Sequence, residues 1–344
     1  MIITTLRIKF KEYCVLLFVL LFICAIVSSP NACIDGAKSG LAVCAVSLVP
    51  SLFPFAVAVL FLINTNALKN SKYKYLFVFL LSLVGGYPIG AKLIGELCKN
   101  GTLESEKCKK LLPFCVNAGP AFIVLVVGKG ILKSTSLGYI LLISHLISEI
   151  ICVLIFAPEI LFTKQSRIKS EENRSLLDNL VLSVQGAAGA VFSLCAYVIF
   201  FAVINGYIQH FSGLFKPLSN LIYLTEITAA VMQTGNLYFI SFLLGFAGIS
   251  IWVQVYSVAG GIRPRYLHFA AVRTLHGALS AAVTILAVRI LGVHTATLGN
   301  GGKYGAEIFY SNLTLSISLL IMALLLAISI SGKKHSGNLL KDML

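Results

Sequence analysis

The chain has 344 residues, of which 58% are hydrophobic and 12% are charged, and its formal net charge is +14. A water-soluble domain cannot bury so large an apolar fraction, so the composition indicates a polytopic membrane protein. The basic residues lie in short clusters between apolar runs, as the positive-inside rule predicts, and no basic stripe interleaved with aromatic residues points to nucleic acid as a partner. The nine cysteines show no C-x-x-C spacing, so we expect neither a metal site nor a disulfide framework.

The first apolar run covers residues 12–29 and follows Arg7, Lys9 and Lys11. A basic start before a short apolar run is also typical of a signal peptide. Cleavage would have to occur just before Pro30, and further spans follow, so the sequence favours an uncleaved first helix with a cytosolic N-terminus.

Six further membrane spans are predicted by length and hydrophobicity, at 41–64, 111–131, 137–161, 181–207, 266–291 and 312–331. The first of these contains Pro50 and Pro54, which predict a kink or an unwound turn, because proline removes a backbone donor and clashes with the preceding turn. The second contains Asn-Ala-Gly-Pro at 117–120, which predicts another break.

An apolar segment at 82–98 is interrupted by Gly-Gly-Tyr-Pro at 85–88. Lysines flank it on both sides, namely Lys69, Lys72 and Lys74 before it and Lys99, Lys107, Lys109 and Lys110 after it. Both flanks therefore look cytosolic, which predicts a re-entrant hairpin whose tip lies at 85–88. Non-helical backbone at membrane depth is tolerated only inside protein or along a cavity, so the tip should face the protein interior.

A second apolar segment, 242–261, is also interrupted by glycines, and it is likewise followed by a basic linker and a long apolar helix. Paired interrupted segments of this kind point to a binding site in a repeat-built transporter. The insertion 214–236 leaves two arrangements open. If it crosses the membrane, Arg263 and Arg265 are cytosolic and the halves run parallel; if it only enters partway, the halves are inverted and both arginines face outward. The positive-inside rule favours the first arrangement.

The predicted fold is therefore an all-α polytopic membrane protein with two structural repeats, each with a re-entrant or broken helical hairpin followed by a long helix. The expected parts are an N-terminal membrane helix at 1–35, a first repeat at 36–161, a cytosolic linker at 162–180, a second repeat at 181–291, and a final membrane helix with a basic tail at 292–344.

Several motifs follow one another in a specific order, at 49–55 (Val-Pro-Ser-Leu-Phe-Pro-Phe), 85–92, 117–120 and 244–255. Together they resemble sporulation integral membrane proteins of the YlbJ type. That family carries the nucleoside-recognition, or Gate, domain, which also occurs in concentrative nucleoside transporters and in the membrane part of ferrous iron transport protein B. The resemblance implies two Gate-like, inverted repeats with a transport-like core in the cell membrane, including the forespore or spore membrane.

The candidate solute-binding residues are Gly86, Tyr87, Asn117, Thr225, Glu226, Thr228, Ser250 and Gln254. Glu226 is the sharpest of them, because an acidic group at a membrane helix centre costs about 2.5–3.5 kcal/mol on insertion scales. It would bind a hydroxylated or cationic solute, or a coupling proton or sodium ion, and the two flanking threonines would complete an oxygen cage. The structural alternatives are a hydrated Glu226 at the membrane interface and close helix packing at the glycines.

His145 and Glu149 are spaced i, i+4 inside a predicted span, which fits either a proton relay or a mutually satisfied pair that fixes helix packing. Arg273 is expected to reach the membrane interface by snorkelling.

No nucleotide-binding loop, H-E-x-x-H motif or nucleophile elbow occurs, so we expect no enzyme activity and no catalytic residues. The sequence favours a transporter-like protein that binds or moves a small polar solute, nucleoside-like or other, through the bilayer. The alternative is a non-transporting membrane factor needed for spore envelope or cortex assembly. A homo-oligomer is left open.

Overall fold

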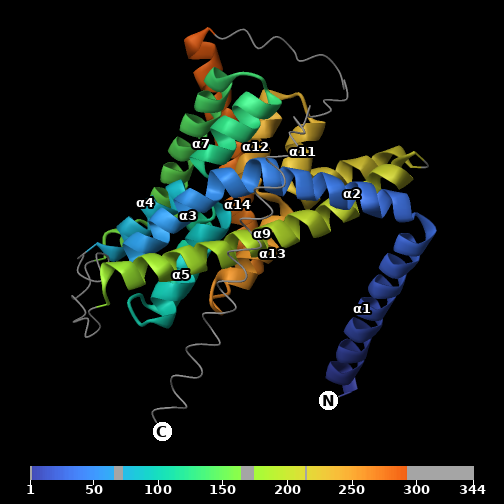
Figure 1. Ribbon diagram of the computed structural model, residues 1–344, viewed down its shortest axis with the longest axis horizontal. Coiled ribbons are helices and arrows are strands. Elements are labelled where there is room, and N and C mark those ends of the chain that lie inside the picture. Colours follow the sequence, from blue (N-terminus) through green and yellow to red (C-terminus); the bar gives the residue numbers. More distant parts are fainter. Residues whose placement is uncertain (1, 66–72, 164–173, 214, 293–344) are drawn as a thin grey trace.

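A computed structural model describes residues 2–65, 73–163, 174–213 and 215–292, without the side chains of residues 2–11. These residues form helices and contain no strand (Figure 1). The elements are α1 (Ile2–Ser28), α2 (Pro30–Val43), η1 (Cys44–Leu48), α3 (Val49–Asn64), α4 (Lys74–Gly85), α5 (Tyr87–Lys99), α6 (Ser105–Leu111), η2 (Leu112–Cys115), η3 (Phe122–Ile131), α7 (Thr135–Phe156), α8 (Pro158–Leu161), α9 (Leu176–Ser212), η4 (Lys216–Leu221), α10 (Ile222–Thr225), α11 (Ile227–Gln233), α12 (Leu237–Phe246), α13 (Gly248–Val258) and α14 (Tyr266–Leu291).

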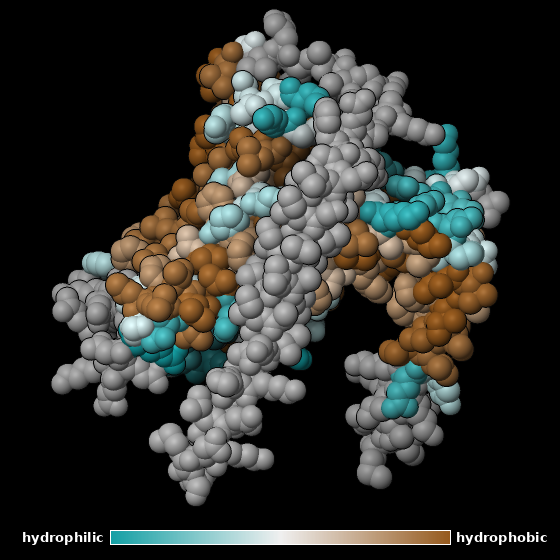
Figure 2. All heavy atoms as spheres, in the orientation of Figure 1, coloured by the Kyte–Doolittle hydropathy of each residue, from teal (hydrophilic) through white to brown (hydrophobic). Residues whose placement is uncertain are grey.

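Within the described part of the chain, five helical runs are long and apolar enough to cross a membrane, namely Pro30–Asn64, Thr135–Phe156, Leu176–Ser212, Leu237–Val258 and Tyr266–Leu291. Their exposed surface is rich in leucine, isoleucine, valine and phenylalanine, which gives the molecule the broad hydrophobic bands seen in Figure 2. The prediction of an all-α polytopic membrane protein is confirmed. The span predicted at 312–331 lies outside the described residues.

The helical run formed by α2 and α3 packs along α9, which runs antiparallel to it. Gly36 lies against Ala202 and Val203, Gly40 lies against Ile199, and the side chain of Asn64 donates to Ser183. A Cβ atom on Gly36 would lie only 2.7 Å from the carbonyl oxygen of Ala202, so the small residues permit the close approach. The predicted kink around the prolines takes the form of a π-helical turn, η1, directly before Pro50, while Pro54 lies inside α3.

The first interrupted segment forms a helical hairpin. The chain reverses at Gly86, which has a φ of +82°, a conformation that favours glycine. The arms α4 and α5 lie side by side, with Ser82 of α4 against Gly90 of α5. Near the start of α4, the Tyr75 hydroxyl accepts a hydrogen bond of 3.1 Å from the amide of Glu104, which follows α5. Both ends of the hairpin therefore lie together, and the turn is where the glycines predict it.

The second interrupted segment is a broken helix rather than a hairpin. Ala247 and Gly248 both have a φ of +73°, which ends α12 and starts α13 in a new direction. The arm α12 packs antiparallel to α14, with Gly245 against Gly277, whereas the end of α13 packs on α5, with Ala259 against Gly95. The insertion before it is itself interrupted, at Glu226, between the short helices α10 and α11.

One end of the helix bundle is strongly charged. Lys109, Lys110, Arg263 and Arg265 line one hollow there together with Glu106 and Glu159. The hydrogen bond from Lys109, with Arg265 nearby, lowers the pKa of Glu106 below its usual range. The arginines that follow the second interrupted segment thus share an end with the lysines that follow the hairpin.

Gly90 tests the hairpin packing. A Cβ atom there would lie 2.0 Å from the carbonyl oxygen of Cys115, whereas one on Gly189 of α9 would meet nothing within 4 Å. We expect Gly90→Ala to destabilise the protein by about 1–3 kcal/mol through overpacking. Gly189→Ala should be neutral or stabilising by roughly 0.5–1 kcal/mol. Thermal unfolding in detergent compares the two, and equal midpoints would contradict the packing.

Single cysteines test the arrangement of the ends, in a background lacking the native cysteines. Asn100 follows α5, Arg263 precedes α14, and His210 lies in the last turn of α9. Asn100→Cys and Arg263→Cys should react with an impermeant thiol reagent from the same side of the membrane. His210→Cys should react from the other side. Labelling of Asn100 and Arg263 from opposite sides would contradict the broken-span geometry.

Candidate functional site

Four interruptions of helical structure meet inside the molecule. Gly86, at the hairpin tip, lies against Gly119 between η2 and η3. Gly248, at the break between α12 and α13, lies against the carbonyl groups of Leu224 and Thr225. These two residues directly precede the fourth break, which is at Glu226 between α10 and α11. The breaks at Gly86, Gly119 and Glu226, with Ile251 of α13, border a cavity of about 30 Å³, lined by Leu48, Leu52, Gly86, Tyr87, Pro88, Gly119, Phe122, Leu194, Val198, Glu226, Ile227, Thr228 and Ile251. We call it the central cavity.

The central cavity lies at the mid-height of the long helices. Leu48 is close to the middle of the helical run Pro30–Asn64, and Leu194 is at the middle of Leu176–Ser212. Both helices are long enough to cross a bilayer, and the cavity lies beside their middle turns, away from either end. Interrupted helices at this depth are the usual place for the solute sites of secondary transporters.

Glu226 is the acidic residue of this cavity. Its side chain caps α11, because the carboxylate Oε2 accepts a hydrogen bond of 2.8 Å from the Ala229 amide. Only 4% of the residue is exposed, so the hydrated interface position considered from the sequence does not apply within this structure. Thr228 lines the same cavity, 3% exposed. A carboxylate oxygen and a hydroxyl thus lie together in an otherwise apolar enclosure.

Two of the candidate residues donate hydrogen bonds to backbone carbonyl groups at helix breaks. The Tyr87 hydroxyl donates a hydrogen bond of 2.8 Å to the carbonyl oxygen of Leu244, which a continuous helix would have paired with the amide four residues later. The Asn117 side chain donates in the same way to the carbonyl oxygen of Phe114, at 2.8 Å. Its Oδ1 atom is buried without a partner, and the residue does not line the central cavity.

The remaining candidates bond to each other or to a neighbouring helix. Ser250 and Gln254 are buried and bond to each other, with a distance of 3.1 Å between Nε2 and Oγ, away from the cavity lining. The Thr225 hydroxyl lies 2.6 Å from Oδ1 of Asn205 on α9. The structure therefore brings Glu226, Thr228, Gly86 and Tyr87 together and leaves Asn117, Thr225, Ser250 and Gln254 around them. Asn205 was missed by the sequence analysis, although an asparagine in an apolar helix is a signal for it.

The central cavity has room for one water molecule or one small ion. A larger solute requires the surrounding breaks to move apart. Across the described ranges, no group of three or more His, Cys, Asp or Glu residues is arranged to hold a metal ion.

A second polar cluster lies between α7 and α14 and is fully buried. The Glu149 carboxylate Oε2 lies 3.4 Å from Nη1 of Arg273 and 2.7 Å from Nδ1 of His276, although the imidazole is not oriented to form a directed hydrogen bond. The centroids of the His145 and His276 rings lie 4.5 Å apart, and the two rings are tilted by 55°. The snorkelling prediction for Arg273 is wrong, because the guanidinium is 0% exposed and also donates to the carbonyl oxygen of Pro113.

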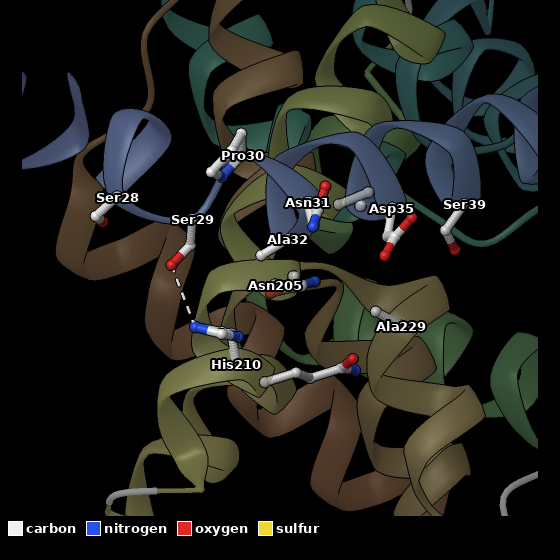
Figure 3. Close-up of a pocket in the computed structure, with 14 residues that line it drawn as sticks. Ser28, Ser29, Pro30, Asn31, Ala32, Asp35, Ser39, Asn205, His210 and Ala229 are labelled. Atoms are coloured by element: carbon white, nitrogen blue, oxygen red, sulfur yellow. Dashed lines mark hydrogen bonds between the residues drawn. The ribbon is translucent and has the colours of Figure 1, made fainter. Parts of the chain in front are cut away.

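A larger hollow, of about 640 Å³, lies between α2 and the end of α9 (Figure 3). Its wall includes Asn31, Asp35 and Ser39 of α2 and Asn205, Gln209 and His210 of α9. The His210 ring lies 3.2 Å from the Ser29 hydroxyl at its rim. We call this hollow the vestibule.

These features define a multi-pass α-helical membrane protein with interrupted helices around a mid-membrane cavity. The chain is 22% identical, over 335 residues, to the sporulation integral membrane protein YlbJ of Bacillus subtilis (strain 168). The similarity covers 78% of this chain and 81% of that protein, which bears out the resemblance drawn from the motifs. No family model matches the chain, and no solved structure matches it.

The buried ion pair gives a prediction on stability. Glu149→Leu leaves the Arg273 charge buried without its counter-ion, which should destabilise the protein by about 3–5 kcal/mol. The double variant Glu149→Leu with Arg273→Met removes both charges and should recover most of that loss. Glu104→Gln, which breaks an exposed pair with Lys107, should cost no more than about 1 kcal/mol. Thermal unfolding measures all three, and a double variant as unstable as the single one would refute the pairing.

Proposed function

We propose that this chain is a sporulation-associated integral membrane protein that binds a small polar solute at the central cavity and moves it across the membrane. The observation that carries the proposal is the burial of Glu226 at mid-membrane height, at the point where four helix interruptions meet. Buried ionisable groups in membrane spans are costly and usually mark solute or ion pathways.

The chemistry of the cavity indicates the class of solute. A carboxylate accepts hydrogen bonds and attracts cations, and Thr228 adds a hydroxyl that donates or accepts. The site therefore suits a hydroxylated or cationic solute, with a proton or a sodium ion as the coupling ion. Nucleoside-like compounds fall in this class through their ribose hydroxyls.

The closed cavity suggests how transport would proceed. At about 30 Å³ it excludes a solute of nucleoside size, so the structure corresponds to a closed state of the proposed cycle. The hairpin tip at Gly86 and the break at Glu226 both line it. Movement of either would open the cavity toward one side of the membrane.

Antiparallel packing supports the two-repeat organisation within this proposal. The helical run α2–α3 is antiparallel to α9, and α7 is antiparallel to α14, with one member of each pair in each half of the chain. If the broken helix α12–α13 crosses the membrane, the two halves can be inverted while Arg263 and Arg265 lie on the same side as the two ends of the α4–α5 hairpin. By the positive-inside rule that side is cytosolic, as is the N-terminus.

A second candidate function is that of a non-transporting membrane factor in spore envelope or cortex assembly. It is favoured by the small, mostly apolar cavity and by the name of the similar protein, which refers to sporulation. A structural factor should tolerate the loss of Glu226 while it depends on its exposed surfaces.

Glu226→Gln separates the two candidates. The change keeps the cap of α11, since an amide oxygen also accepts a hydrogen bond, but it removes the charge. We expect solute flux into liposomes, measured over nucleosides, amino acids and metal ions, to fall to background. We also expect the variant to fail to restore sporulation in a deletion strain.

The control is Glu106→Gln, at the exposed charged end, which should retain full function. If Glu226→Gln restores sporulation completely and the unaltered protein shows no flux with any solute, the transport proposal is refuted in favour of the structural factor.

A further inference from the structure

We propose that the vestibule is a loading site for a small cationic or neutral hydrogen-bonding solute on its way to Glu226. The first turn of α11 and the Asn205–Thr225 hydrogen bond form the gate between the vestibule and the central cavity. This inference rests on the proposed transport function, because it places an entrance ahead of the central cavity.

Two polar stripes face each other across the vestibule. Asn31, Asp35 and Ser39 recur every four residues along α2, so they share one face of that helix. Asn205 and Gln209 have the same spacing on α9. Figure 3 shows the side chains of Asn31, Asp35 and Ser39 directed from α2 toward α9. Such stripes are expensive in apolar helices unless water or a solute contacts them.

Asn205 lies at the deep end of the vestibule and has an unused donor. The residue is 3% exposed, and its Oδ1 atom bonds to the Thr225 hydroxyl at 2.6 Å. Its Nδ2 atom is buried without a partner. A buried amide donor without a partner costs roughly 1–3 kcal/mol, which a bound solute with an acceptor oxygen or nitrogen would offset.

A single helical turn separates the vestibule from the central cavity. Ala229 lines the vestibule, and its amide holds the carboxylate of Glu226 at 2.8 Å. Glu226, Ile227 and Thr228, the preceding residues, line the central cavity. Since the Thr225 hydroxyl ties this turn to Asn205, breaking that one hydrogen bond would free the turn to move.

The charge of the vestibule selects its ligand class. Among the described residues that line it, Asp35 is the one side chain that carries a formal charge when histidine is neutral, and the other polar groups are amides, hydroxyls and an imidazole. Cations and neutral polar solutes are therefore favoured over anions. The volume of about 640 Å³ lies within the range of small-molecule sites, roughly 300–1,000 Å³.

The charge preference can be measured without knowing the solute. The reporter is Ser39→Cys in the full-length protein lacking its native cysteines, and the probes are a cationic and an anionic methanethiosulfonate of similar size. We expect the cationic reagent to react about fivefold faster relative to a free thiol, as one nearby carboxylate predicts. Asp35→Asn should remove this preference, and Asp178→Asn, at the other end of α9, should keep it. Equal rates for the two reagents, or no reaction, would overturn the loading site.

The gate is tested with a cysteine inside the central cavity and the small reagent aminoethyl methanethiosulfonate. Thr228→Cys is the first reporter, and Leu194→Cys is the second, in case the first fails to fold. We expect Thr225→Val to raise the reaction rate several-fold, because it removes the hydrogen bond to Asn205 and keeps the side-chain shape. Thr65→Val, which removes an exposed hydroxyl bonded to Leu62, is the control and should leave the rate unchanged.

An unchanged rate with Thr225→Val would overturn the gate. Both measurements report accessibility rather than flux, so their failure is distinguishable from a failure of Glu226-dependent transport.

Discussion

The structure depends on the need of every backbone polar group at membrane depth for a partner. A continuous helix meets this need by itself, whereas an interrupted helix leaves carbonyl and amide groups unpaired. Here side chains accept that role, either from another segment or from just beyond the break. The Tyr87 hydroxyl donates to the carbonyl oxygen of Leu244 on α12, the Asn117 side chain donates to Phe114, and the Trp252 indole donates to Phe246 at 3.4 Å. The carbonyl groups that each break leaves unpaired thus accept the hydrogen bonds that hold the surrounding segments in place.

Small residues and buried polar groups both join the long helices. Glycine and alanine pack closely between α2 and α9, and the Asn64 side chain of α3 donates to Ser183 of α9. Buried polar groups join α14 to its neighbours, with Glu149 beside Arg273 on the α7 side and Ser241 bonded to Ser280 and Thr284 on the α12 side, each at 2.8 Å. Gly245 of α12 also lies against Gly277 of α14, so both sets of helices combine close packing of small residues with polar contacts.

The broken form of the α12–α13 segment allows the two halves to be inverted and the basic residues to lie on one side of the membrane, two conditions that a hairpin could not meet together. A hairpin at 242–261 would return the chain to the side from which it came, so inverted halves would place Arg263 and Arg265 outside. A broken helix that continues across the bundle brings them to the end that holds Lys109 and Lys110. Positive charge can then stay on one side while the halves run in opposite directions. The left-handed residues Ala247 and Gly248 interrupt the helix without folding its arms against each other.

Local sequence determined the membrane class, the positions of most spans, and the breaks at Gly86 and Asn117–Pro120. Hydrophobic length, glycine and proline act within a few residues of themselves, so their effects can be predicted from the chain, whereas the break at Glu226 was found only in the structure. The sequence also singled out Glu226, Thr228, Gly86 and Tyr87, but it could not show that they line one cavity.

Only the tertiary structure decided the partners of the polar groups. Glu149 lies against Arg273, 124 residues away, rather than in an isolated pair with His145, and Asn205 bonds to Thr225. It also decided that Arg273 is buried and that α12–α13 is broken rather than folded back. These outcomes depend on which helices become neighbours, and that is set by packing over the whole bundle rather than by any local pattern.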